Sequence, residues 1–253
     1  MAFVLIRFFP AVGAVAYLAL LLVLPYEYQY WLWITIGAAV AASLYVALCG
    51  WRLQRFYFWP HLLYAALLAA TGVVTVLVLA HENTVTVVSI GWSVMLGLYL
   101  EAFFRYVFKS ERAELVDIRY VVSYSSIITW FAVAAVTRHV ATFLAYGWWW
   151  LPLVSFVAMW VLLVPQLQVS NPAIRTTIGL SAIGALLMAE LATAVWYWPV
   201  SVWVAAGALT VAGYWLQLAV TAQIWHWTRR QLWAYGGSTA VLIIALLATA
   251  QWL

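Results

Sequence analysis

The sequence predicts an all-α polytopic transmembrane helical bundle. Of its 253 residues, 68% are hydrophobic and only 7% are charged, whereas a soluble domain carries about 25% charged residues. The apolar residues form continuous runs such as 73–80 and 158–165, without the alternation that a membrane β-barrel strand requires. Because every backbone N–H and C=O group inside lipid must be paired within the protein, these runs indicate helices. We expect a single integral membrane domain over residues 1–253.

Nine segments are apolar over the length that a bilayer requires, which is about 20 residues. Polar or turn-forming residues separate them: Glu27 follows the first, Arg52 and Arg55 follow the second, Pro172 precedes the seventh, and Pro199 fits the first turn of the eighth. The predicted spans are residues 8–25, 30–50, 57–80, 84–104, 119–138, 142–165, 174–196, 199–222 and 233–252. The longest polar stretch, residues 105–119, separates the fourth span from the fifth.

The distribution of positive charge predicts the orientation. Cytoplasmic loops of membrane proteins collect Lys and Arg. With nine spans and a cytoplasmic N-terminus, every Lys and Arg except Arg138 falls on the cytoplasmic side, and a missed or extra span in the middle would destroy this pattern. We therefore expect the N-terminus in the cytoplasm and the C-terminus outside, in a cell membrane such as a prokaryotic inner membrane.

Aromatic residues mark the ends of the predicted spans. Trp and Tyr favour membrane–water interfaces, and they gather at residues 148–150 and 196–198. The aromatic turn at 28–31 is similar to the one at 196–198, and the basic turn at 51–55 is similar to the one at 227–231. These similarities indicate a 3+3+3 helix layout with an inverted middle unit. The alternative is that topology rules alone produce such turns.

Glu190 is the strongest candidate for a functional residue. It lies about 14 residues, or roughly 21 Å, from the inner end of the seventh span, and no basic residue lies within one helical turn of it. A charge at this depth is unfavourable, so Glu190 must pair across helices, be protonated or face water. Two interpretations remain open: a proton-responsive or substrate-binding group, or a protonated acid that donates one interhelical hydrogen bond.

Other polar and small residues fit structural roles. Glu101 and Arg105 are spaced i, i+4 and can form an ion pair on one helix face. Gln217 can connect helices through hydrogen bonds, and Gly91 with Gly97 is expected to let helices approach closely. We expect the one cysteine of the chain to be a small buried residue.

The histidines raise the question of a haem. We expect His61 and His226 at the inner face and His81 and His139 at the outer face, which resembles the ligand arrangement of two-haem membrane cytochromes. Haem ligands usually face one another within helices, however, and His81 and His226 fall in predicted turns. We therefore expect interfacial histidines and no bound cofactor, with His61 and His139 as the residues to test for haem.

Several chemistries lack their motifs. Asp117 is the only aspartate, so no paired Asp-rich motif can bind a diphosphate through magnesium. The chain has no Walker loop, no HExxH zinc motif and no serine-hydrolase elbow. Lys109 lies outside the spans, so a retinal Schiff base is excluded. The basic residues are scattered, which excludes a nucleic-acid partner, and we expect membrane lipids and membrane proteins as partners.

Three functions remain. The first is a carrier or binder of a lipid-like or small apolar substrate, in which Glu190 takes part. The second is a structural or accessory subunit of a membrane complex. The third is a membrane-embedded lipid-modifying enzyme with Glu190 or Glu101 as the acid; the missing catalytic motifs favour a protein that is not an enzyme.

Overall fold

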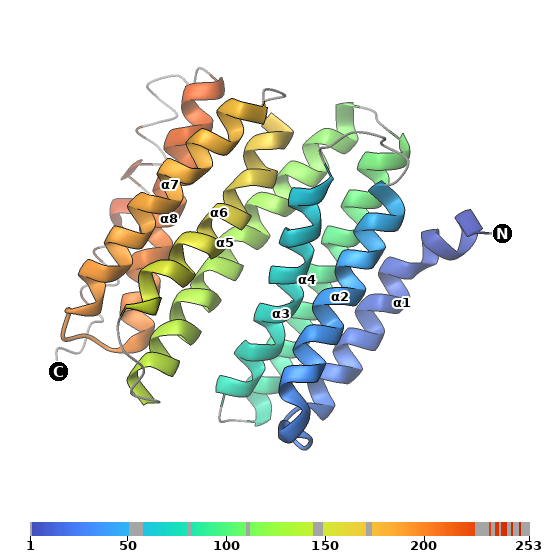
Figure 1. The fold of residues 1–253 in the computed structure, drawn as a ribbon, viewed down its shortest axis with the longest axis horizontal. Coiled ribbons are helices and arrows are strands. Elements are labelled where there is room, and N and C mark those ends of the chain that lie inside the picture. The colour runs from blue at the N-terminus through green and yellow to red at the C-terminus, as the bar shows by residue number, and fades with distance from the viewer. Residues whose placement is uncertain are drawn as a thin grey trace. The chain divides into compact units, whose positions relative to one another are not determined.

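Helices form the described structure. The computed structural model describes residues 2–50, 58–79, 82–109, 112–143, 149–170 and 174–225, together with single positions between 233 and 248. In chain order the elements are α1 (Ala2–Val23), the 3-10 turn η1 (Tyr28–Tyr30), α2 (Trp31–Gly50), α3 (Trp59–Val78), α4 (Glu82–Lys109), α5 (Arg112–Phe143), α6 (Trp150–Ser170), α7 (Ile174–Trp196) and α8 (Val202–Trp225). These ranges contain no strand element, which confirms the predicted all-α fold (Figure 1).

The helices have the length and composition of membrane spans. Within the described ranges, seven helices, α2 to α8, are long and apolar enough to cross a bilayer. The apolar part of α1, Arg7–Val23, is shorter. Most of the ninth predicted span, residues 233–252, lies outside the described residues. The count of nine spans and the orientation therefore stay predictions.

Several helix boundaries differ from those expected. For example, α5 extends to Phe143 and α6 runs from Trp150 to Ser170, whereas the predicted spans are 119–138 and 142–165. Helix α4 continues to Lys109 and α5 begins at Arg112, so most of the polar stretch 105–119 is helical, which suits residues such as Glu, Lys and Arg that favour helices. Helix α8 begins after Pro199, at Val202. There the hydroxyl of Ser201 accepts a hydrogen bond from the backbone N–H of Val204 at 3.4 Å, as an N-cap does.

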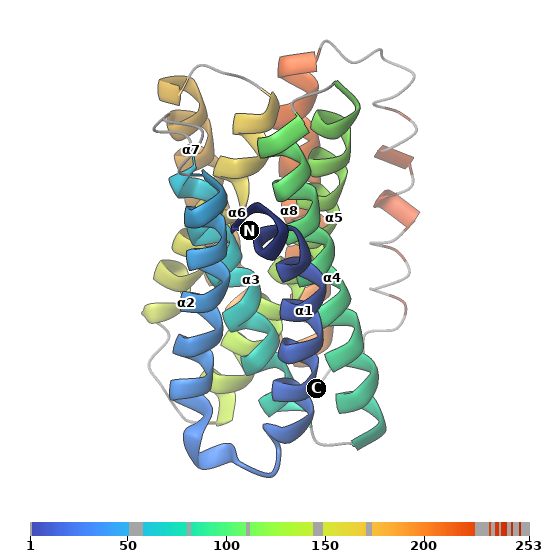
Figure 2. The ribbon, with the colours of Figure 1, turned by 90° about the vertical axis from the view of Figure 1, so that its right-hand side faces the viewer.

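The chain divides into two compact units, residues 1–129 and residues 130–253, and α5 contributes to both. In the first unit α2 packs against α3 and α1 packs against α4, and Figure 2 shows α1 beside α4. In the second unit α7 packs against α6, and α8 contacts both of them. The 3+3+3 layout stays a prediction.

A glycine makes room for aromatic side chains in the core of the first unit. The Tyr17 hydroxyl donates a hydrogen bond to the Ala69 carbonyl at 2.6 Å. A Cβ atom at Gly72, less than one helical turn further along α3, would lie 2.3 Å from that hydroxyl and 3.2 Å from the Trp92 ring. Gly72 therefore allows α1 and α4 to approach α3 at this level.

The second unit has a similar arrangement. The indole Nε1 of Trp130 donates a hydrogen bond to the Leu209 carbonyl at 2.9 Å. A Cβ atom at Gly213, one turn further along α8, would lie 2.9 Å from the same indole and 3.6 Å from Met159. Trp130 is only 1% exposed, so this hydrogen bond is buried.

Arg138 forms hydrogen bonds at the C-terminal end of α7. Its guanidinium donates hydrogen bonds to the carbonyls of Val195 at 2.7 Å, Trp198 at 2.9 Å and Val200 at 3.2 Å, and its Cζ lies 5.8 Å from the centre of the Trp196 ring. The last carbonyls of a helix lack intrahelical partners, and a cation there also interacts favourably with the helix dipole. Arg138 therefore stabilises the turn between α7 and α8.

Candidate functional site

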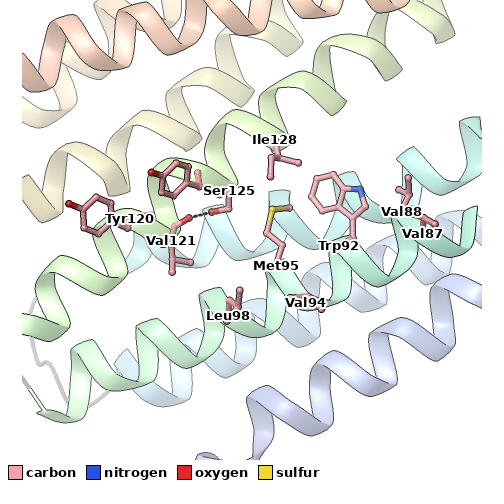
Figure 3. A pocket seen from close by; sticks show the side chains of 12 residues that line it. Val87, Val88, Trp92, Val94, Met95, Leu98, Tyr120, Val121, Ser125 and Ile128 are labelled. Carbon is pink, nitrogen blue, oxygen red and sulfur yellow. Dashed lines mark hydrogen bonds between the residues drawn. The ribbon is translucent and has the colours of Figure 1, made fainter. Parts of the chain in front are cut away.

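An apolar groove with a volume of about 530 Å³ lies between α4 and α5 in the first unit. The α4–α5 groove is lined by Val87, Val88, Gly91, Trp92, Val94, Met95, Leu98, Tyr120, Val121, Tyr124, Ser125 and Ile128. Val87 is 70% exposed and Tyr124 is 65% exposed, so the groove opens to the side of the helix pair. Figure 3 shows Val87 and Trp92 toward one end and Tyr120 at the other.

Helical spacing and one glycine explain why this groove exists. On α4, Val87, Gly91, Val94 and Leu98 recur every three or four residues and so share one face. A Cβ atom at Gly91 would meet no atom within 4 Å. The prediction that Gly91 allows a close helix approach is therefore wrong, whereas a Cβ atom at Gly97 would lie 2.9 Å from the Ala14 Cβ atom of α1.

A buried tyrosine from α3 binds the residues of α5 that lie beside the α4–α5 groove. The Tyr64 hydroxyl donates to the Val122 carbonyl at 3.1 Å and lies 2.6 Å from the Ser125 hydroxyl and 3.2 Å from the Ser126 hydroxyl. Tyr64 and Ser126 are fully buried. Ser125 is the one serine of the groove lining, and its hydroxyl is occupied by this contact within the protein. The groove therefore presents mainly carbon atoms to a ligand.

Two arginines meet one carboxylate at the ends of α1 and α4. The Glu101 Oε1 atom lies 2.8 Å from Arg105 Nε and 2.7 Å from Arg7 Nη1. The structure thus brings together Glu101 and Arg105, as their spacing predicts, and adds Arg7 from a helix that is distant in sequence. The Arg7 guanidinium also lies over the Phe104 ring, 5.2 Å from its centre.

Glu190 lies on an exposed face of α7. It belongs to a second groove of about 540 Å³, the α7–α8 groove, lined by Leu187, Met188, Glu190, Leu191, Ala194, Ala212, Trp215, Leu216 and Ala219. Glu190 makes no hydrogen bond or ion pair with another residue in the part of the chain that the structure describes. Its carboxyl group is thus the one ionisable group in the lining, which is apolar apart from the Trp215 indole N–H.

The other polar candidates occupy different places. Gln217 is buried in α8, at 3% exposure. His61 is buried in the first unit, where its Nδ1 lies 3.2 Å from the Tyr99 hydroxyl. His139 belongs to the second unit, and its ring lies 4.3 Å from that of Phe143. Residues 81 and 226, the other two histidines, lie outside the described residues.

Metal-binding residues do not gather in the ranges that the structure describes. No group of three His, Cys, Asp or Glu residues there has the geometry to hold a metal ion. Cys49 is completely buried as a free cysteine in α2.

Sequence reasoning missed three features of these sites. The α4–α5 groove was not predicted, although the i, i+3, i+4 stripe of apolar residues on α4 is its signal. Arg7 contributes to the sequence analysis only as one of the positive charges that predict the orientation, and nothing in the sequence relates it to Glu101. Arg138 was the exception to the charge rule, and its contact with the end of α7 gives that exception a structural role.

Comparisons with known proteins add no relative: no protein family, curated protein or solved structure matches this chain. The class of the protein therefore rests on its own helices. They define an all-α, multi-pass membrane protein.

Proposed function

We propose that this protein binds a lipid-like apolar molecule in the α4–α5 groove and acts as a binder or carrier of such molecules in a cell membrane. The single observation behind the proposal is the volume and the apolar lining of the α4–α5 groove. Small-molecule pockets typically measure about 300–1,000 Å³ and have mainly apolar walls. A polar solute would lose its hydrogen bonds to water here and gain few in return.

The sideways opening supports the same proposal. Val94 and Leu98 on α4 are more than half exposed, as is Ile128 on α5. A molecule dissolved in the hydrocarbon layer can reach these residues without crossing water. Neither charged groups nor a described metal site lies in the lining, which favours binding over catalysis.

Photo-crosslinking tests this function. Purified protein in phosphatidylcholine nanodiscs is labelled with a phosphatidylcholine that carries a diazirine in one acyl chain, and mass spectrometry maps the labelled peptides. We expect labelling of residues 87–98 and 120–128 to exceed that of equally exposed positions on α2 such as Val40 and Leu44. Equal labelling of all exposed helix faces would mean that the groove holds only bulk lipid, which overturns the proposal.

A matched pair of variants sharpens this test. Gly91→Phe places a ring in the open space of the groove, so it should remove most of the preferential labelling. Gly37→Phe is the control, because a Cβ atom at Gly37 also meets no atom within 4 Å and Gly37 lies outside the groove. Labelling that survives Gly91→Phe would contradict the assignment of the site.

Glu190 favours a second candidate function, an accessory subunit of a membrane complex. An exposed carboxyl group within an apolar span is unfavourable unless a proton or a partner neutralises it. A basic side chain on the membrane helix of another protein would do so. Glu190 makes no hydrogen bond or ion pair with another described residue, although the Trp215 indole lines the same groove.

Purification from native membranes tests the second candidate. A stoichiometric membrane partner should co-purify with the unmodified protein and be lost from Glu190→Gln. Glu27→Gln is the control, because Glu27 is an exposed acid outside the helices. A protein that purifies alone, or a partner that remains bound to Glu190→Gln, would exclude this function.

A further inference from the structure

The cluster of Arg7, Glu101 and Arg105 contains two positive groups for one negative group, whereas a structural ion pair needs only one. Both guanidiniums contact the same carboxylate oxygen, Glu101 Oε1. The Arg7 side chain is 44% exposed and the Arg105 side chain is 41% exposed, whereas that of Glu101 is 25% exposed. The positive groups therefore face outward, and the negative group lies beneath them.

This cluster is held in place before any ligand binds. A guanidinium has five N–H donors in a planar fork, and the contact of Arg7 with Glu101 uses one donor nitrogen, Nη1. Contact with the Phe104 ring restrains the Arg7 guanidinium further. The restrained Arg7 guanidinium has further N–H donors. A guanidinium of this kind is well suited to a phosphate group, which it can bind through two parallel hydrogen bonds.

The cluster also continues the line of the α4–α5 groove. Leu98 lines the groove, and Arg105 follows it by seven residues, or two helical turns, so both lie on nearly the same face of α4. The distance along the helix is roughly 10 Å. Arg105 lies three residues before the end of the apolar segment Asn83–Phe108, where lipid headgroups would meet a spanning helix, and Arg7 begins the shorter apolar segment Arg7–Val23.

We propose that Arg7 and Arg105 bind the phosphate of an anionic membrane lipid whose acyl chain lies in the α4–α5 groove. This inference rests on the proposed lipid-binding function and names its ligand class. Basic pockets between membrane helices attract anionic headgroups. A net negative headgroup is preferred over a zwitterionic one because the choline cation of the latter would be repelled by the two guanidiniums.

A comparison of two headgroups on the same acyl chain tests the inference. Diazirine-labelled phosphatidylglycerol and phosphatidylcholine are each added as a trace to nanodiscs of unlabelled phosphatidylcholine. We expect phosphatidylglycerol to label the α4–α5 groove more strongly. Arg7→Gln and Arg105→Gln should each lower the phosphatidylglycerol-to-phosphatidylcholine labelling ratio about fivefold, the change expected for losing one basic residue at the membrane surface.

Three further variants separate binding from structure. Arg7→Lys keeps the charge and should retain most of the ratio. Glu101→Gln removes the competing carboxylate and should raise the ratio, which a purely structural ion pair would not do. Arg175→Gln removes an exposed charge from α7 and should leave the ratio unchanged.

The outcomes distinguish the two proposals. If both lipids label the groove equally and Arg7→Gln changes nothing, the headgroup inference fails and the proposed function survives. If neither lipid labels the groove preferentially, the proposed function fails and takes the inference with it. If inorganic phosphate, but not chloride at equal ionic strength, abolishes the preference, the arginines bind a free anion and the lipid assignment is wrong.

Discussion

In each compact unit a buried aromatic side chain packs against a glycine of a neighbouring helix and donates a hydrogen bond to a backbone carbonyl of that helix. Tyr17 does so beside Gly72 in the first unit, and Trp130 does so beside Gly213 in the second. Each bond satisfies the polar atom of a buried aromatic, which the apolar surroundings require. The cores of the two units are therefore built on the same principle.

The grooves on the two units differ although their volumes are nearly equal, about 530 and 540 Å³. The α4–α5 groove has no charged residue in its lining, whereas the α7–α8 groove contains Glu190. Apolar walls accept a hydrocarbon chain without further change. A carboxyl group needs a proton or a partner. Under the two proposed functions we therefore expect different occupants: a lipid in the first groove and a basic group of a membrane partner in the second.

The largest expected effect on stability comes from the glycine against which the aromatic side chain packs in each core. Gly72→Ala and Gly213→Ala should each lower the free energy of unfolding by about 2–3 kcal/mol, because the added methyl group displaces a buried aromatic and its hydrogen bond. Thermal or denaturant unfolding of the purified protein in detergent measures this loss.

Gly179→Ala is the control for both variants, because a Cβ atom there meets no atom within 4 Å. It should leave stability unchanged or raise it slightly, since alanine favours helices over glycine. A neutral effect of Gly72→Ala would mean that Tyr17 and Trp92 adjust freely, and the comparison of the two cores would lose its basis.

The next largest effect should distinguish Arg138 in the second unit from Arg7 in the first. Arg138→Gln should lower the free energy of unfolding by about 2 kcal/mol, because the half-buried guanidinium donates to three carbonyls at the end of α7. Arg7→Gln should lower it by less than about 1 kcal/mol, because an exposed ion pair contributes little. The same unfolding measurement compares the two variants.

Equal losses would change this interpretation. A large loss for Arg7→Gln would make its contact with Glu101 mainly structural and weaken the case for a headgroup site. A small loss for Arg138→Gln would mean that water or lipid satisfies the carbonyls of Val195, Trp198 and Val200 equally well.

The sequence predicts features that depend on one helix and misses features that depend on two. The all-α fold follows from uninterrupted apolar runs, and the contact of Glu101 with Arg105 follows from i, i+4 geometry. Arg7 lies 94 positions from Glu101, so their contact depends on how α1 packs against α4. Local patterns carry little information about that packing.

Gly91 and Gly97 illustrate the same limit. Both are small residues on α4, and the sequence treats them alike. In the structure Gly97 faces Ala14 of α1, whereas Gly91 faces the open α4–α5 groove. Composition shows that a helix face is small and apolar, but only the arrangement of neighbouring helices decides whether that face is covered.

Glu190 should give the smallest effect on stability, and this small effect is informative. Because its carboxyl group makes no hydrogen bond with another described residue, Glu190→Gln should change the free energy of unfolding of the isolated protein by no more than about 0.5 kcal/mol. Unfolding in detergent, without partners, is the measurement. A loss well above 1 kcal/mol would reveal a partner for Glu190 within the chain, and the contrast between the two grooves would then reflect internal packing instead of different occupants.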